Sequence, residues 1–235
     1  MIVVLANYGN VKTILLSKIN FMSTKHEVHN LIILDESGSM ESIKKPVISG
    51  FNELVQTIKG IETRFPEQAH FISLVTFNTA GRKTLLWKEP VVKLKPIDEN
   101  SYQPGEATPL YDAMGDSINK LKNDLYTAGA HNVLVTVFTD GLENASKEYS
   151  ATQIKNLVEE LQKHNWTFTY IGTDHDVHSV AVSISIKNVM KFEKNISGMK
   201  DMFLRESTAR HSYSTKIRAK EDTSGNFYED DKKKS

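Results

Sequence analysis

The sequence of 235 residues contains no cysteine. This absence excludes a disulfide framework and any thiolate metal site, so a bound metal would be left with oxygen and imidazole ligands. It also favours a cytoplasmic location, because disulfide-dependent folds are concentrated among secreted proteins.

The chain also lacks an excess of either charge, because 29 lysine and arginine residues balance 29 aspartate and glutamate residues. Without a net electrostatic field, nucleic acids and anionic membrane surfaces are disfavoured as partners. Long hydrophobic runs are missing as well, since the two apolar stretches within residues 1–21 both fall short of the roughly 18 residues that span a bilayer. We therefore expect neither a nucleic-acid partner nor a membrane partner.

The length is sufficient for one large domain with a substantial core. Residues 1–21 lack the basic start and the small-residue cleavage site of a signal peptide, so we interpret them as an upstream extension, with an extra packed strand as the alternative. The domain itself is predicted to cover residues 22–210. Residues 211–235 are rich in serine, aspartate and lysine and have few apolar side chains, which predicts a disordered tail.

Strands and helices alternate between these limits. Hydrophobic periodicity predicts strands at Val28–Asp35, His70–Asn78, Lys83–Leu94, His131–Asp140, Trp166–Thr173 and Asn188–Phe192. It predicts helices at Ile43–Ile61, Pro109–Leu125, 150–164, Val177–Ile184 and Ser197–Arg210. Gly81 indicates a tight antiparallel connection between the second and third strands. The alternation predicts a doubly wound, mostly parallel α/β sheet with one antiparallel edge strand and helices on both faces.

Three polar segments are expected to meet at one edge of this sheet. Asp35 ends the first strand in DESGS, Thr108 precedes a helix in GEATPLYDAM, and Asp140 ends a central strand in TDGLEN. In the D-x-S-x-S pattern alternate side chains point the same way, so Asp35, Ser37 and Ser39 can offer oxygen to one point. Such a set of carboxylates and hydroxyls suits a small hard cation, Mg²⁺ first, with Mn²⁺ or Ca²⁺ as alternatives.

Together these motifs resemble the von Willebrand factor A (vWA) domain with its metal-ion-dependent adhesion site. DESGS matches the D-x-S-x-S loop of that family, Thr108 its second-loop threonine and Asp140 its third-loop aspartate. The later stretch FTYIGTDHDVHSVAVSISI is similar to stand-alone intracellular bacterial vWA proteins, and the resemblance covers about residues 28–210. It implies a Rossmann-like sheet and a metal that contacts an Asp or Glu of a partner protein. We expect a non-catalytic module that is a monomer on its own. Loops including Tyr102–Glu106 and Glu143–Asn144 are expected to select that partner.

An enzyme is the alternative function. Asp35 at the end of a parallel strand could act as the nucleophile of a Mg²⁺-dependent phosphohydrolase or phosphotransferase. Such sites usually have a second acid two residues later, where this chain has Ser37, and the sequence contains no phosphate-binding G-x-x-x-x-G-K-[ST] loop. These two departures favour a binding module.

Several of the polar residues also have purely structural interpretations. Ser39 and Thr108 are both suited to cap the helices that follow them. Asp112 is expected to support the start of its helix, and Glu36 to be solvated. The run from residue 174 to residue 178 offers carboxylates and imidazoles for a second metal, although an aspartate N-cap explains it more simply.

Overall fold

The computed structural model of the chain describes residues 25–173 and 176–228, so the proposed upstream extension lies outside the described part. Six strands form one sheet in the order β3-β2-β1-β4-β5-β6. The strands are β1 (His26–Asp35), β2 (Gln68–Asn78), β3 (Gly81–Pro90), β4 (His131–Thr139), β5 (Trp166–Gly172) and β6 (Asn188–Lys191). All neighbours pair in parallel except β2 and β3, which are antiparallel. The predicted doubly wound sheet with one antiparallel edge strand is therefore confirmed.

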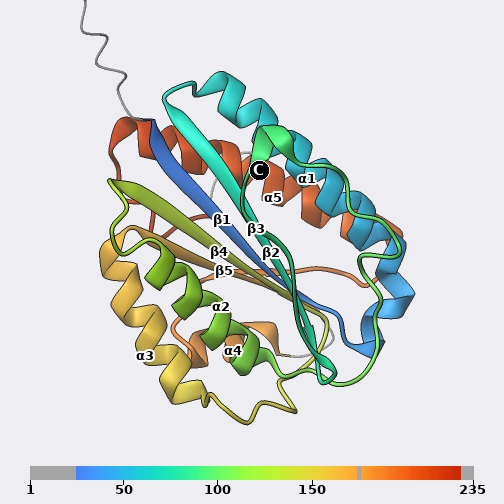
Figure 1. Cartoon of the computed structure of the whole chain (residues 1–235). Coiled ribbons are helices and arrows are strands. Elements are labelled where there is room, and N and C mark those ends of the chain that lie inside the picture. The colour runs from blue at the N-terminus through green and yellow to red at the C-terminus, as the bar shows by residue number, and fades with distance from the viewer. Residues whose placement is uncertain (1–24, 174–175, 229–235) are drawn as a thin grey trace, which may run out of the picture.

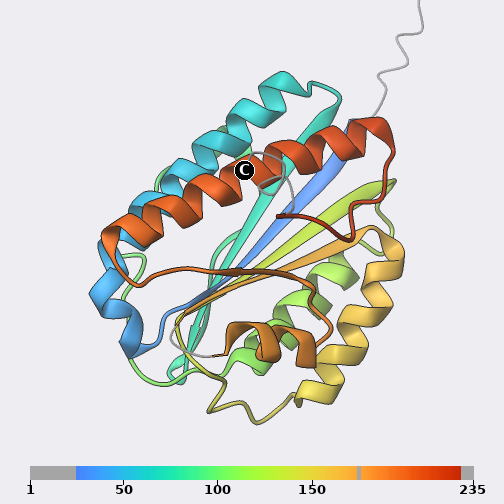
Figure 2. The same ribbon diagram turned by 180° about the vertical axis from the view of Figure 1, so that it is seen from behind.

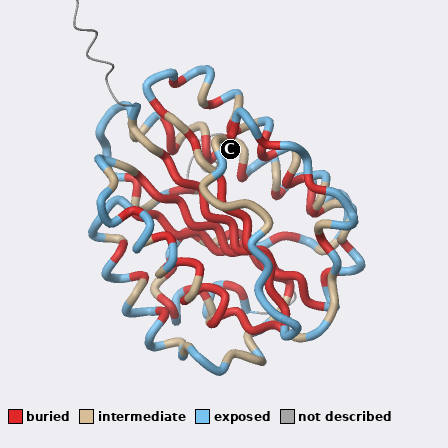
Figure 3. Tube along the Cα trace, viewed as in Figure 1, coloured by how far each residue is buried: buried red, intermediate tan, exposed pale blue. Residues whose placement is uncertain are grey.

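Helices cover both faces of the sheet (Figures 1 and 2). They are α1 (Lys44–Arg64), α2 (Leu110–Asp124), α3 (Ala151–Leu161), α4 (Val177–Ser183) and α5 (Ile196–Ala219). Short 3₁₀ segments, η1 (Gly38–Ile43), η2 (Val91–Lys93) and η3 (Gln162–His164), lie between strands and helices. Helices α1 and α5 pack together on one face, and α2, α3 and α4 pack on the other. Each face buries its own apolar core, so the central strands are buried on both sides (Figure 3).

The order of the strands defines where a ligand site is expected. From β1 the chain crosses to β2 on one side, and it later returns to place β4 on the other side of β1. The carboxyl ends of β1 and β4 therefore form the topological switch point of the sheet, which is where open α/β folds bind their ligands. Asp35 is the last residue of β1, and Asp140 directly follows β4.

The last helix is longer than the sequence suggested, and the predicted tail is wrong for the residues up to 228. Helix α5 continues to Ala219, and its added turns bury Tyr213 against the sheet. The chain then folds back so that Phe227 packs on Tyr213 and Val28. The segment has few apolar residues, but Tyr213 and Phe227 are almost fully buried, and Ile217 and Tyr228 pack half-buried beside them. Residues 229–235 lie outside the described part.

Polar contacts complete the attachment of this C-terminal segment. Thr167 donates its hydroxyl to the carbonyl of Thr223 at 2.8 Å, and the Phe227 amide donates to Asn188 Oδ1 at 3.0 Å. Gln68 of β2 donates to the carbonyl of Ser214 at 2.9 Å. These bonds use polar side chains at the starts of β5, β6 and β2. Residues 211–228 are therefore an integral part of the domain.

A buried ion pair fastens α5 to the middle of the sheet. Arg210 and Glu206 are nearly inaccessible to solvent and pair with each other one helical turn apart. The guanidinium also donates to Asn30 of β1 at 2.6 Å and to Thr136 of β4 at 2.8 Å, and Tyr228 donates its hydroxyl to Glu206 at 2.8 Å. Since Arg210 and its three partners are all buried, removal of one is expected to be costly. None of the helices in the described part combines the length and the hydropathy needed to cross a membrane.

Two buried histidines should make the fold sensitive to acid. Burial lowers the pKa of His29 to about 4 and that of His70 to about 3, and the nearby charge of Arg210 adds to the effect on His70. In the unfolded chain these histidines have their ordinary pKa of 6.5, so each opposes folding progressively as the pH falls below that value. We expect each to remove roughly 2 kcal/mol of unfolding free energy between pH 7 and pH 5.

Urea unfolding at pH 7 and pH 5 measures this loss. His70→Gln should reduce it by about the share of one histidine, again roughly 2 kcal/mol, whereas the exposed His164→Gln should leave it unchanged. An equal loss in the parent and in the His70 variant would contradict the assignment.

Candidate functional site

The D-x-S-x-S loop makes a tight turn between β1 and η1. The Ser37 amide donates to Asp35 Oδ1 at 2.8 Å, which fixes the first carboxylate against its own loop. The neighbouring loop is attached on the outer side, because the Gly38 amide donates to the carbonyl of Glu106 at 3.0 Å and the Gly105 amide donates to the carbonyl of Glu36 at 2.9 Å. The D-x-S-x-S loop is therefore fixed by a bond to its own Asp35 side chain and by two backbone bonds to the loop at residues 105–106.

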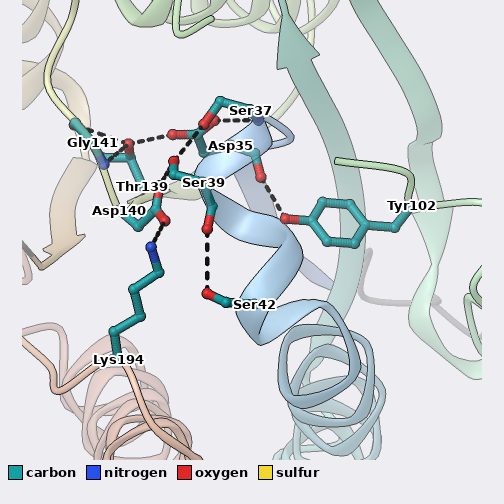
Figure 4. A network of polar contacts seen from close by, with 9 residues as sticks. All are labelled: Asp35, Ser37, Ser39, Ser42, Tyr102, Thr139, Asp140, Gly141 and Lys194. Atoms are coloured by element: carbon teal, nitrogen blue, oxygen red, sulfur yellow. Dashed lines mark hydrogen bonds and ion pairs between the residues drawn. The ribbon is translucent and has the colours of Figure 1, made fainter. Parts of the chain in front are cut away.

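Four of the five predicted site residues form one connected polar cluster (Figure 4). The hydroxyls of Ser37 and Ser39 lie 3.2 Å apart. Ser39 donates its hydroxyl to Asp140 Oδ1 at 2.6 Å, across 101 positions of sequence. Together with the Ser37 bond to Asp35, these contacts bring oxygens from the ends of two neighbouring strands to one place.

Thr108, the fifth predicted residue, lies beside this cluster. Its hydroxyl oxygen is 3.7 Å from the position that a Cβ on Gly141 would occupy, next to Asp140. Its amide donates to Asn144 Oδ1 at 3.0 Å, and its carbonyl accepts from the Asn144 amide at 3.2 Å. The expectation that Thr108 is the N-cap of α2 is wrong, because Pro109 occupies that position.

The environment of Asp35 disfavours its charge. Its side chain is fully buried, and burial raises its pKa to about 6, with a further upward contribution from Asp140. The hydroxyl of Thr139 donates to Oδ2 at 2.5 Å and partly opposes this rise. Metal-free protein therefore holds Asp35 under electrostatic strain that a nearby cation would relieve.

Asp140 meets a cation of the protein itself. Its Oδ2 lies 2.6 Å from Lys194 Nζ and forms an ion pair with it. Figure 4 shows the lysine approaching from the side away from the Ser37 hydroxyl. The two oxygens of Asp140 thus have different partners, a serine hydroxyl on one and an ammonium on the other.

Sequence reasoning missed three residues that shape the site. They are Thr139, which bonds Asp35; Lys194, which pairs with Asp140; and Tyr102, whose buried hydroxyl donates to the Asp35 carbonyl at 2.7 Å. Tyr102 was expected to lie on a partner-selecting loop, and its burial corrects that view. Thr139 could have been found from the sequence, since it is the last residue of a buried strand and directly precedes Asp140. The tyrosine and the lysine come from irregular segments that have no such pattern.

Of the polar residues near the site for which a purely structural role was expected, some have that role and others do not. Ser39 does not cap a helix, because Ser37 is the N-cap of η1 and no side chain makes the capping bond. Glu36 is buried rather than solvated, accepting from the Gln103 amide at 2.6 Å and pairing with Lys83 at 3.0 Å. Asp112 is structural, as expected, although it acts by accepting three amides of residues 147–149. Asp176 is confirmed as the N-cap of α4, while residues 174 and 175 lie outside the described part.

The oxygen set fits a small hard cation. Two carboxylates and the serine hydroxyls face one another, with the Thr108 hydroxyl beside them, and all of these donors are of the type that Mg²⁺ and Mn²⁺ prefer. Within residues 25–173 and 176–228, no three His, Asp or Glu side chains gather in a way that could hold a metal. A metal at this site would therefore depend on the hydroxyls as much as on the carboxylates.

Comparisons with known proteins show similarity at the level of the fold. No protein-family model and no curated protein matches the sequence. Among solved structures, proximal thread matrix protein 1 from the mussel byssus aligns with a TM-score of 0.54 and 13% identity over 80% of this chain and 47% of that chain. The pilus adhesin SpaC from Lactobacillus rhamnosus GG aligns with a TM-score of 0.54 and 9% identity over 79% of this chain and 30% of that one.

A third match is the type V pili tip protein Mfa5 from Porphyromonas gingivalis, with a TM-score of 0.50 and 12% identity over 74% of this chain and 48% of the Mfa5 domains. The present chain spans less than half of the length of each of these structures. At such identities the similarity shows the fold alone. That fold is the Rossmann-like α/β fold implied by the resemblance to vWA domains.

Proposed function

We propose that the protein is a metal-dependent protein-binding module of the vWA type. Its site is formed by Asp35, Ser37, Ser39, Thr108 and Asp140, which would hold one Mg²⁺ and leave a coordination position for an Asp or Glu of a partner protein. The observation that carries this proposal is the hydrogen-bonded chain from Ser37 through Ser39 to Asp140 at the switch point of the sheet.

The charges of the site explain why a partner carboxylate would be needed. Hydroxyl ligands add no charge, so at most two carboxylates face the divalent ion, and Lys194 offsets one of them. When bound, the ion supplies an electrophilic centre short of negative charge. An acidic side chain of a partner would provide both an oxygen ligand and the missing charge.

The surroundings of Asp35 favour binding over phosphoryl transfer. A nucleophilic carboxylate must present an oxygen to its substrate. Here Oδ1 accepts the Ser37 amide, Oδ2 accepts the Thr139 hydroxyl, and the side chain has no exposed surface. Asp35 is thus arranged to support a metal site rather than to attack a phosphorus atom.

Exposed apolar side chains next to the site suggest how a partner would be held around the metal. Leu142, two residues after Asp140, is 54% exposed, and Ile196, two residues after Lys194, is 79% exposed. A partner segment seated over the metal would cover these two side chains and remove their apolar surface from water. The proposed partner segment therefore carries an acidic residue with apolar neighbours.

A pull-down from native lysate with the immobilised protein tests this function. Specific binders should be lost with EDTA and return with added Mn²⁺, because the metal bridges the two proteins. They should also be lost from Ser37→Ala/Ser39→Ala, which removes two hydroxyl ligands at the rim of the sheet. The matched control is Ser42→Ala on the same turn, whose hydroxyl donates to the Ser39 carbonyl at 3.4 Å.

The binders should show a corresponding requirement. Replacing the acidic residue of an identified partner by its amide should abolish retention by the parent protein. Partners retained equally by parent and double variant, with and without EDTA, would refute a metal-bridged contact.

A further inference from the structure

Lys194 occupies a fixed position next to the site although it comes from a connecting loop. Its ammonium lies 2.6 Å from Asp140 Oδ2, and its side chain is only 21% exposed while the carboxylate is fully buried. Lysine is among the residues least often buried without a specific reason. Its position beside a proposed metal ligand therefore calls for a function.

The backbone around Lys194 is held on both sides. Before it, the Phe192 amide donates to the carbonyl of Gly172 at the end of β5, at 3.1 Å. After it, Asn195 is the N-cap of α5, with Oδ1 accepting the Gly198 amide at 2.8 Å. The loop between β6 and α5 thus aims the lysine at Asp140.

We propose that Lys194 is a resident cation of the site, which lowers its affinity for divalent metal and makes tight metal binding depend on a partner's carboxylate. The inference deepens the proposed function and rests on it. In metal-free protein the ammonium compensates the buried charge of Asp140, whose other oxygen accepts the Ser39 hydroxyl. A divalent ion arriving at the hydroxyls is repelled by this ammonium a few ångströms away.

A partner carboxylate would offset the repulsion between the Lys194 ammonium and the metal ion. It is attracted by the metal and by the ammonium together, so it stabilises the metal-bound state more than a neutral ligand does. By thermodynamic linkage, the partner then raises metal affinity by the same factor as the metal raises partner affinity. The protein alone would bind metal measurably but less tightly than it does once a partner is engaged.

Calorimetric titration of the full chain with Mn²⁺ tests the role of the lysine. Lys194→Met should bind Mn²⁺ at least about tenfold more tightly than the parent, because it removes a like charge near the ion. Lys194→Arg keeps the charge and should bind like the parent. Lys191→Met is the matched control, since it removes an exposed charge from the preceding strand and should change nothing.

Thermal unfolding supplies a second readout. Without metal, Lys194→Met should melt below the parent because Asp140 loses its counter-charge, and Mn²⁺ should raise its melting temperature more than that of the parent. If the parent binds Mn²⁺ and Lys194→Met binds equally or more weakly, the inference is overturned while the metal site stands. If neither protein binds Mn²⁺, the proposed function fails as well.

Discussion

Deleting residues 211–235 is expected to abolish folding of the domain. The deletion removes the last turns of α5, the buried side chains of Tyr213 and Phe227, and the half-buried side chain of Tyr228. Truncating a single buried aromatic typically costs about 3–5 kcal/mol, and the total stability of a domain is about 5–15 kcal/mol. The loss of two buried aromatics, together about 6–10 kcal/mol, and of the contacts of Tyr228 is therefore comparable to the whole stability.

Circular dichroism and thermal melting measure this outcome. The single variant Phe227→Ala should still fold, with an unfolding free energy lower by about 3–4 kcal/mol. The control deletion of residues 229–235, a segment without apolar side chains, should melt like the parent. A folded, cooperatively melting chain that ends at Arg210 would show that the C-terminal segment is dispensable after all.

Replacing either acid of the site by its amide is expected to abolish measurable Mn²⁺ binding. Asp35→Asn and Asp140→Asn keep the shape and a hydrogen-bond acceptor but remove half of the negative charge facing the ion. We expect a loss of at least about 100-fold in affinity, or about 2.7 kcal/mol. Asp201→Asn on the exposed side of α5 should bind Mn²⁺ like the parent.

The Asp35 variant should also be more stable than the parent without metal. Burial raises the pKa of Asp35 from 3.8 to about 6, so at pH 7 the folded state holds a charge that the unfolded state accommodates more easily. This difference corresponds to up to about 3 kcal/mol of lost stability at neutral pH. A variant that is stabilised yet cannot bind Mn²⁺ would separate the metal role of Asp35 from any role in folding. Unchanged Mn²⁺ binding in both amide variants would show that the ligand assignment is wrong.

The sheet and its switch point were predictable because their signals are local. Strands such as His131–Thr139 are continuous apolar runs, and each ends at a polar residue that must lie at the sheet edge. Once the strands are parallel, Asp35 and Asp140 fall on the same edge without further information. The D-x-S-x-S spacing then orients the serines.

The features that the sequence did not predict depend on contacts between segments distant in the chain. The C-terminal segment is polar in composition, yet its backbone groups bind side chains at the starts of strands, as in the bond from Thr167 to the Thr223 carbonyl. Composition does not distinguish such a segment from a disordered one. Lys194 reaches Asp140 through a long side chain from a loop 54 positions away in sequence, and Tyr102 is buried from an irregular stretch. Neither has a periodicity that would reveal its position.

The location of a bound metal tests the central claim most directly. Crystals soaked in Mn²⁺ should show one strong anomalous peak within about 2 Å of hydroxyl oxygens of the Ser37–Ser39 pair, next to Asp140 and beside Thr108, and crystals of Ser37→Ala/Ser39→Ala should lack it. A parent crystal with no peak among these residues, or with its only peak elsewhere, would contradict the proposed metal-dependent adhesion site.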